Sequence, residues 1–350
     1  MKQSRATKTG LIGVAGLLVA TVAGCGAGGG AEADATTLTV LDFGGPYQEA
    51  HEKEYFAPCA EELGITIKTD EPTDLSKIRT AVDAGNVPWD VVNITNDFGS
   101  DKTGTDYLEP IDYGIVDKTL LLDGYADKFR VGSDIEATVI AYNSETFPTA
   151  PASFKDFFDT EKFPGKRALY RSVSSGVLEA ALIADGVAPE ELYPMDLDRA
   201  FAKLDTIKDD IIWWETGASS QSLLATGEAA MGLVWVGRAA DAARVDKAPI
   251  AVAYDEWVQV DDYWAIPKGA KNPELANELI QCMSGTEKQI AWSDLMVYGP
   301  VNKEAAADPK VMSEELRPTN HLEGQIPVDD DYWASEYDTI AQRFNDWIAQ

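Results

Sequence analysis

Short apolar segments alternate with amphipathic ones early in the chain, and this alternation limits its possible folds more than any other feature. We expect strands at 38–41, 65–67 and 89–94, separated by helices with recognisable ends. Gly64 stops the first of these helices and Asp74 caps the second. A β-α-β-α-β order needs crossover helices that cover a mainly parallel sheet. The sequence therefore predicts an α/β protein.

A second region of the same style begins near Asn143. It contains a helix around Phe201, another that begins near Gln221, and an apolar strand at 231–235. Farther on, Asn272 is placed to cap a helix with proline at its first position. The chain closes with an amphipathic helix, whose apolar face is made by Tyr337, Ile340, Ala341, Phe344 and Trp347.

The first 25 residues resemble an export signal. Three basic residues are followed by an apolar run at 11–22, which is too short to span a bilayer core of about 30 Å, and small residues precede Cys25. This order predicts a lipoprotein signal at 1–24, cleaved before a lipid-modified Cys25 and followed by a flexible tether at 25–37. An ordinary cleaved signal and a short membrane helix are the alternatives. The lipoprotein signal places the protein on the outer face of the cell membrane.

Net charge and chain length restrict the possible functions and the domain organisation further. Without residues 1–24 the chain carries 26 basic against 59 acidic side chains, a net charge of −33, and such a surface repels nucleic acid. A mature chain of 326 residues exceeds the usual size of a single core, so we expect two domains. No second apolar stretch is long enough to cross a membrane.

Cysteine and histidine are scarce in the chain. Cys59 and Cys282 lie in expected helices, where they would form a disulfide in an oxidising compartment if those helices are neighbours, or would remain two buried thiols. Only His51 and His321 are present, far apart in sequence, so we expect no histidine-rich metal site.

Two glycines follow the first strand, where open α/β sheets place their ligand sites. Gly44 and Gly45 let the backbone approach a small molecule, and Phe43 and Tyr47 offer flat faces beside them. Chemistry alone leaves open a plain turn with packed aromatic rings.

An ordered set of motifs carries a family resemblance that covers nearly the whole mature chain. The motifs lie at 42–47, 89–92, 163–167, 213–218, 227–228, 234–238 and 262–273. Together they resemble the spermidine/putrescine-type extracellular solute-binding proteins of ATP-binding-cassette (ABC) importers. The resemblance implies an α/β, two-lobed periplasmic-binding-protein-like fold of type II, with crossover hinge strands near 136–142 and 251–257. It divides the chain into lobe 1 at 38–140 and 255–325, and lobe 2 at 141–254 with the C-terminal helix at 326–350.

The resemblance also implies a set of cleft residues. They are Phe43, Tyr47, Asp97, Phe98, Trp235, Asp262 and Tyr298. An alkylammonium ligand needs a carboxylate for its charged head and aromatic walls for its methylene chain. Asp262 would pair with the head, and Trp235, Phe43 and Tyr47 would enclose the chain. Trp235 could instead be a core residue, Asp262 a solvated loop acid, and Trp213 and Trp214 either core residues or cleft walls.

One departure from the family bears on the ligand. The polyamine-binding members have an acidic pair after the Phe-Pro-Gly-Lys segment, whereas residues 171–176 of this chain contain no acid. A smaller amine, or an amino acid such as 4-aminobutyrate whose carboxylate faces Arg171, is then an alternative to spermidine. Ser219, Ser220 and Gln221 could supply polar contacts to either ligand.

These features predict a monomeric lipoprotein that captures a small cationic solute and delivers it to an ABC permease. The predicted solute is a polyamine. The same importer role for an amino acid or another zwitterion is the alternative. A lipid-anchored secreted enzyme is the rival class, but the chain has no Gly-x-Ser-x-Gly elbow, no His-Glu-x-x-His motif and no phosphate-cradling loop. We therefore expect no catalysis, no cofactor and no metal. A ligand-sensing partner of a membrane receptor would use the same cleft.

Overall fold

The computed structural model describes residues 36–350. The expected signal at 1–24, the lipidation site Cys25 and nearly all of the expected tether lie outside the described residues, and the first strand begins at Thr37. The strands are β1 (Thr37–Leu41), β2 (Thr66–Asp70), β3 (Val91–Thr95), β4 (Arg130–Asn143), β5 (Arg167–Tyr170), β6 (Ile211–Trp214), β7 (Met231–Trp235), β8 (Ile250–Ala265), β9 (Gly299–Pro300) and β10 (Gln325–Ile326). The α-helices are α1 (Gly45–His51), α2 (Ala57–Leu63), α3 (Leu75–Asp83), α4 (Gly104–Tyr107), α5 (Phe154–Phe157), α6 (Val177–Ala184), α7 (Leu197–Asp205), α8 (Gly217–Ala225), α9 (Val236–Arg244), α10 (Pro273–Met283), α11 (Thr286–Leu295), α12 (Lys303–Ala306), α13 (Pro309–Met312) and α14 (Asp330–Ile348).

The strands form one mixed sheet, in the order β2-β1-β3-β8-β4-β7-β5-β6, with β10 beside β8 and β9 beside β4. The outer strands on both sides pair in parallel, as the β-α-β pattern predicts, because helices connect them. The central strands β4 and β8 are antiparallel to each other and to their neighbours β7 and β3.

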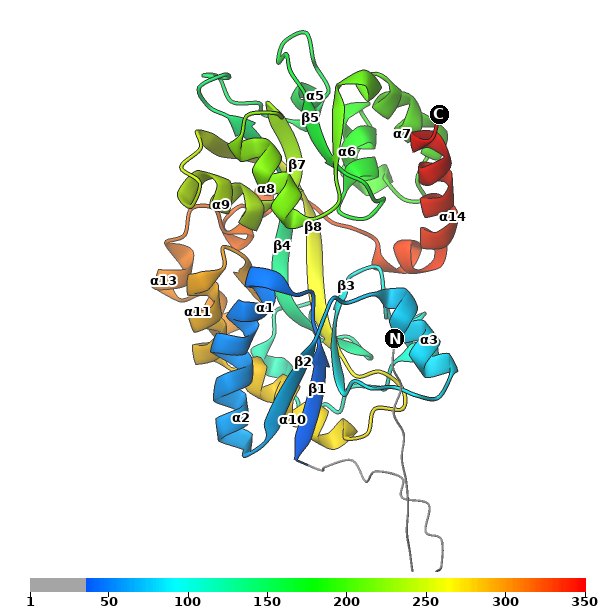
Figure 1. Cartoon of the computed structure of the whole chain (residues 1–350), viewed down its shortest axis with the longest axis vertical. Coiled ribbons are helices and arrows are strands. Elements are labelled where there is room, and N and C mark those ends of the chain that lie inside the picture. Colours follow the sequence, from blue (N-terminus) through cyan, green and yellow to red (C-terminus); the bar gives the residue numbers. More distant parts are fainter. Residues whose placement is uncertain (1–35) are drawn as a thin grey trace, which may run out of the picture. The chain divides into compact units, whose positions relative to one another are not determined.

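The two central strands join two large hydrophobic cores, and a third, smaller cluster forms around Trp214, Leu224 and Val234. The strands pair from Arg130 opposite Ala265 to Asn143 opposite Ile250, with two irregularities in register. Figure 1 shows them running from the helices α1, α2 and α10 to the helices α5 to α9. One core is built mainly on β1, β3, α2, α10 and α11, and the other on β5, α6, α7 and α14. This confirms the predicted two-lobed α/β class with long crossover strands, and the exact lobe boundaries remain a prediction.

Several helix ends follow from local sequence. Gly64 ends α2 in the left-handed region at φ 66°, and the Asp74 carboxylate accepts the Ser76 N–H at the start of α3. Asn272 precedes α10 as expected, but its side chain does not cap the helix. Its amide donates to Asp90 Oδ1 instead, which attaches the start of α10 to the segment before β3.

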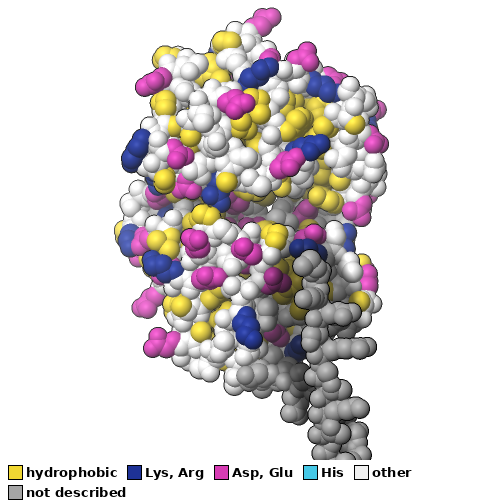
Figure 2. All heavy atoms as spheres, in the orientation of Figure 1, with side chains coloured by type: hydrophobic (Ala, Val, Ile, Leu, Met, Phe, Trp, Pro, Cys, Tyr) yellow, Lys and Arg dark blue, Asp and Glu magenta, His cyan; other side chains and the backbone are white. Residues whose placement is uncertain are grey.

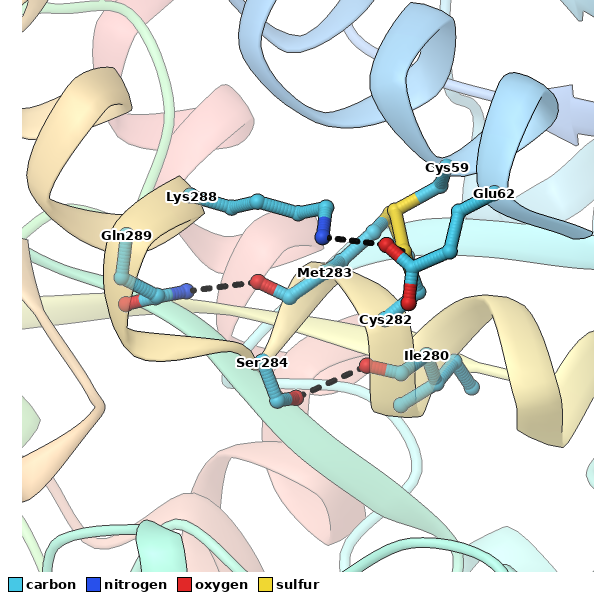
Figure 3. The surroundings of a disulfide bond; sticks show 8 residues. All are labelled: Cys59, Glu62, Ile280, Cys282, Met283, Ser284, Lys288 and Gln289. Atoms are coloured by element: carbon cyan, nitrogen blue, oxygen red, sulfur yellow. Dashed lines mark hydrogen bonds and ion pairs between the residues drawn. A yellow bond between two sulfur atoms is a disulfide. The ribbon is translucent and has the colours of Figure 1, made fainter.

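A disulfide ties α2 to α10 (Figure 3). Cys59 and Cys282 are 223 residues apart in sequence, yet their Cα atoms are separated by 5.9 Å. Close to the disulfide, the Lys288 ammonium lies 2.8 Å from the Glu62 carboxylate. Of the two states that the sequence left open for these cysteines, the structure contains the cross-link.

The face drawn in Figure 2 carries Asp and Glu side chains throughout, with fewer Lys and Arg side chains between them. No helix within residues 36–350 is long and apolar enough to cross a membrane.

Candidate functional site

A cavity of about 390 Å³ lies where β4 and β8 pass between the two cores. The lining comes from both sides. It consists of Phe43, Gly44, Tyr47, Pro72, Thr73 and Thr95 at or after the ends of β1, β2 and β3, of Tyr170, Ser175, Glu215, Thr216, Gly217, Trp235 and Arg238 at or after the ends of β5, β6 and β7, and of Glu136, Val260, Asp262 and Tyr298 around the crossover strands. The volume suits a small molecule rather than a macromolecule.

Three carboxyl groups gather on one face of the crossover strands. Asp134 on β4 stands directly opposite Asp262 on β8, and Glu136 follows Asp134 by two residues and so points to the same face. All three are buried. The Tyr47 hydroxyl donates to Asp134 Oδ2 at 2.5 Å and lies 3.1 Å from Asp262 Oδ2. We call Asp134, Glu136 and Asp262 the acidic cluster.

Burial raises the pKa of every acid in this cluster, because a low dielectric disfavours the charged form. Burial raises the pKa of Asp134 to about 6, against a stabilising hydrogen bond from Tyr47. Burial and the neighbouring charge of Asp134 raise the pKa of Glu136 to about 8. Burial, followed by the charges of Asp134 and Glu136, also raises the pKa of Asp262 well above its usual value.

Tyr47 is held in place by a glycine turn and by buried rings. Gly44 has φ 84°, and a Cβ atom there would lie 2.4 Å from Glu71 Oε2, so this turn requires glycine. The ring of Tyr47 packs at 4.4 Å from His51, whose Nδ1 lies 2.8 Å from Asp42 Oδ2. The hydroxyl is thereby aimed at the acidic cluster.

The opposite wall is aromatic. Trp235 ends β7, and its indole N–H donates to Ser175 Oγ at 3.1 Å. Its ring packs edge-on against Trp214 at 5.0 Å and Tyr170 at 5.5 Å. Trp214 is buried behind this wall, and Trp213 packs against Phe344 of α14, so neither tryptophan lines the cavity.

One guanidinium, that of Arg238, lines the cavity together with members of the acidic cluster. Arg238 lies in the first turn of α9, with its Nη1 3.5 Å from Asp241 and its Nε without a hydrogen-bond partner within residues 36–350. A Cβ at Gly217 would lie 2.5 Å from that Nε, so glycine at the start of α8 makes room for the side chain. The charge of Arg238 lowers the pKa of Glu136, against the larger effect of burial.

The structure brings together five of the seven residues that the resemblance implied. Phe43, Tyr47, Trp235, Asp262 and Tyr298 line the cavity.

Asp97 and Phe98 do not line it. The chain turns directly after β3, where the Phe98 N–H donates to the Thr95 carbonyl, so that Thr95 faces the cavity instead. The Asp97 carboxylate accepts from the Thr95 hydroxyl, and burial raises its pKa. The Phe98 ring is covered by the Arg79 guanidinium at 5.4 Å.

The expected polar contacts also fall elsewhere. Arg171 pairs with Glu215 at 2.6 Å on the surface and is absent from the lining. The residues 219–221 lie inside α8, which begins at Gly217, so Thr216 and Gly217 reach the cavity in their place.

Sequence reasoning missed Glu136 and Arg238 as site residues. Each had a signal, because Glu136 begins the expected crossover strand and Arg238 closes the motif at 234–238, next to the end of a strand.

Comparisons with known proteins identify the class. The family model of the bacterial extracellular solute-binding proteins matches residues 54–319, and the chain belongs to this family. Members of this class deliver small solutes to the permease of an ABC importer.

Individual relatives span almost the whole chain. A gamma-aminobutyric acid-binding protein of Pseudomonas aeruginosa is 36% identical over 332 residues, which cover 91% of this chain and 93% of the relative. The solved structure of a GABA receptor is 38% identical, covers 90% of this chain and 98% of its own, and superimposes with a TM-score of 0.84. A spermidine/putrescine-binding periplasmic protein of Haemophilus influenzae is 26% identical over 69% of each chain.

Proposed function

We propose that this protein captures a small zwitterionic ω-amino acid of the 4-aminobutyrate type for its importer. The observation that carries the proposal is that the Arg238 guanidinium and two members of the acidic cluster, Glu136 and Asp262, line the same cavity. Two relatives whose names specify gamma-aminobutyric acid, at 36% and 38% identity, support it better than the polyamine-binding relative at 26%.

The chemistry of the cavity suits both ends of such a ligand. The ammonium would pair with Glu136 and Asp262, because an ammonium leaves water at an acceptable cost only where an anion meets it. The carboxylate would pair with Arg238, whose planar fork matches two carboxylate oxygens. The methylene chain would lie against Trp235, Phe43 and Tyr47.

A polyamine is the second candidate. The acidic cluster holds three carboxyl groups against one arginine, and this excess favours a cation such as putrescine. Arg238 opposes it, since a second ammonium would lie near this guanidinium, while Glu215 and Asp241 already pair with Arg171 and Arg238. Residues 171–176, which contain no acid, offer no other counter-charge.

We also propose that the protein binds its solute without turnover, as a monomer anchored through lipidated Cys25 on the outer face of the membrane. A tether of about a dozen residues after the lipid would hold the receptor near the permease and raise the local concentration of captured solute.

Titration calorimetry with 4-aminobutyrate, putrescine, spermidine and α-amino acids tests the ligand. We expect saturable heat with 4-aminobutyrate and much weaker binding of both polyamines. Tight binding of putrescine without measurable binding of 4-aminobutyrate would overturn the zwitterion proposal and favour the second candidate.

A further inference from the structure

The surroundings of the acidic cluster supply too little positive charge to balance its three carboxyl groups when all of them are ionised. Asp134 and Asp262 face each other across β4 and β8, and like charges at such directly opposite positions repel each other. Oxygens of two members, Asp134 Oδ1 and Glu136 Oε1, are buried without a hydrogen-bond partner within residues 36–350. Such an arrangement is costly when all three groups are ionised.

The groups that face the cluster do not balance it. They are Asp42, Tyr47 and His51 on the side of α1, Asp261 on β8, Arg238 on α9 and Tyr298 before β9. Arg238 is the one permanent cation among them, and Asp42 and Asp261 add further acids. Tyr55, Tyr125 and Tyr254 lie near the cluster as well, and burial raises the pKa of each of these phenols, so they stay neutral.

Neighbouring carboxyl groups that cannot all ionise share protons. The raised pKa values of Asp134, to about 6, and of Glu136, to about 8, agree with this geometry. An ammonium placed at Glu136 and Asp262 supplies the missing positive charge and favours the ionised form of both.

We propose that the acidic cluster holds at least one proton in the unliganded protein at neutral pH and releases it when the ammonium of a ligand enters the cavity. The exchange balances, since one positive charge leaves as a proton to the buffer while another arrives on the ligand. This inference rests on the proposed function, and it makes ligand affinity depend on pH.

The sign of that dependence follows from linkage. At lower pH the ligand must displace a bound proton, so affinity rises with pH by up to about tenfold per pH unit for each proton released. The ligand itself does not titrate between pH 6 and 8.5, because an alkyl carboxylate titrates near about 4 and an alkylammonium near about 10.4. A change of affinity in this window therefore reports on the protein.

Calorimetry in buffers of different ionisation enthalpy counts the protons. With 4-aminobutyrate at pH 7 in phosphate, HEPES and Tris, we expect the observed enthalpy to vary with buffer enthalpy with a slope equal to release of about one proton. A slope of zero with saturable binding would overturn the inference and leave the proposed function intact. Absence of binding in every buffer would instead contradict the proposed function.

Two variants locate the proton. Glu136→Gln removes one titrating member of the cluster. In this variant we expect the number of protons released per bound 4-aminobutyrate to fall by at least half. Glu179→Gln is the matched control, since Glu179 is also fully buried but lies outside the cavity, accepting from Tyr193 and Trp333. An unchanged proton count in Glu136→Gln would show that Glu136 does not hold the released proton and would contradict the inference for this member of the acidic cluster.

A measurement without ligand tests the first half of the inference independently. In protein labelled with ¹³C at the Asp and Glu carboxyl carbons, we expect a carboxyl resonance that titrates above pH 6 and is missing from Glu136→Gln. If every carboxyl resonance titrates below about pH 5, the cluster holds no proton at neutral pH and the inference is wrong.

Discussion

Arg130 and Asp330 join the crossover strand β4 to the first residue of the C-terminal helix. The guanidinium lies 2.5 Å from the Asp330 carboxylate, donates to the carbonyls of Asn96 and Phe98, and stacks over the Tyr263 ring at 3.9 Å. Farther along α14, Phe344 and Trp347 pack in the second core. The ion pair therefore connects elements of the two cores next to the crossover strands.

Loss of Arg130 is expected to destabilise the fold. Arg130→Leu leaves the Asp330 carboxylate with only the Asn96 amide as partner and leaves two buried carbonyls without their donor, which we expect to cost about 3–5 kcal/mol in the free energy of unfolding. Urea denaturation followed by tryptophan fluorescence measures it. Arg199→Leu, which breaks a surface pair with Asp185, is the control and should cost less than about 1 kcal/mol. Equal losses of unfolding free energy in the two variants would show that the buried contacts of Arg130 stabilise the fold no more than a surface ion pair does.

The disulfide is expected to contribute stability but no affinity. It closes a long loop between α2 and α10, and neither cysteine lines the cavity. The double variant Cys59→Ser, Cys282→Ser should lose about 2–5 kcal/mol of unfolding free energy. Calorimetry on the folded variant should give an unchanged ligand affinity. A large fall in affinity with intact folding would mean that α2 and α10 position the cavity.

Much of the fold was readable from the sequence because its signals are local. Gly64 and Asp74 fix the ends of α2 and α3 through their own backbone and side-chain hydrogen bonds, and β7 spans the expected residues 231–235. The helix α8 begins at Gly217, four residues before the predicted start near Gln221. Thr216 and Ser219 form a reciprocal capping box at Gly217, but serine at the third position is a weaker sequence signal than the usual Glu or Gln.

The site was less predictable, because its charge balance depends on tertiary structure. Glu136 and Arg238 are about one hundred residues apart and meet only when β4 and α9 have assembled on the sheet. The position of Asp262 opposite Asp134 depends on the register of two long strands, which no local pattern fixes. Asp97 does not line the cavity, because the turn that follows β3 withdraws it, and no local pattern indicates this turn.

Arg238 should separate the two candidate ligands. Arg238→Gln removes the proposed partner of the ligand carboxylate, so we expect affinity for 4-aminobutyrate to fall at least about tenfold, while affinity for putrescine is unchanged or improved. Arg199→Gln is the matched control, because Arg199 is an exposed arginine whose partner Asp185 also lies outside the lining. Equal affinity of wild type and Arg238→Gln for 4-aminobutyrate would show that the carboxylate binds elsewhere.

The acidic cluster should make the unliganded protein less stable at alkaline pH. The folded state raises the pKa of Glu136 from the usual 4.5 to about 8, so the folded state binds more protons than the unfolded state between these two values. The stabilising effect of protonated Glu136 is therefore lost as the pH rises through about 8. Glu136→Gln cannot ionise, so the variant should gain on the order of a few kcal/mol over wild type between pH 5 and pH 9. Denaturation series at both pH values, without ligand and at constant ionic strength, measure this difference, with Glu179→Gln as the comparison for loss of a buried acid elsewhere. Parallel stability curves for wild type and Glu136→Gln would show that Glu136 is already ionised at pH 5 in the folded protein.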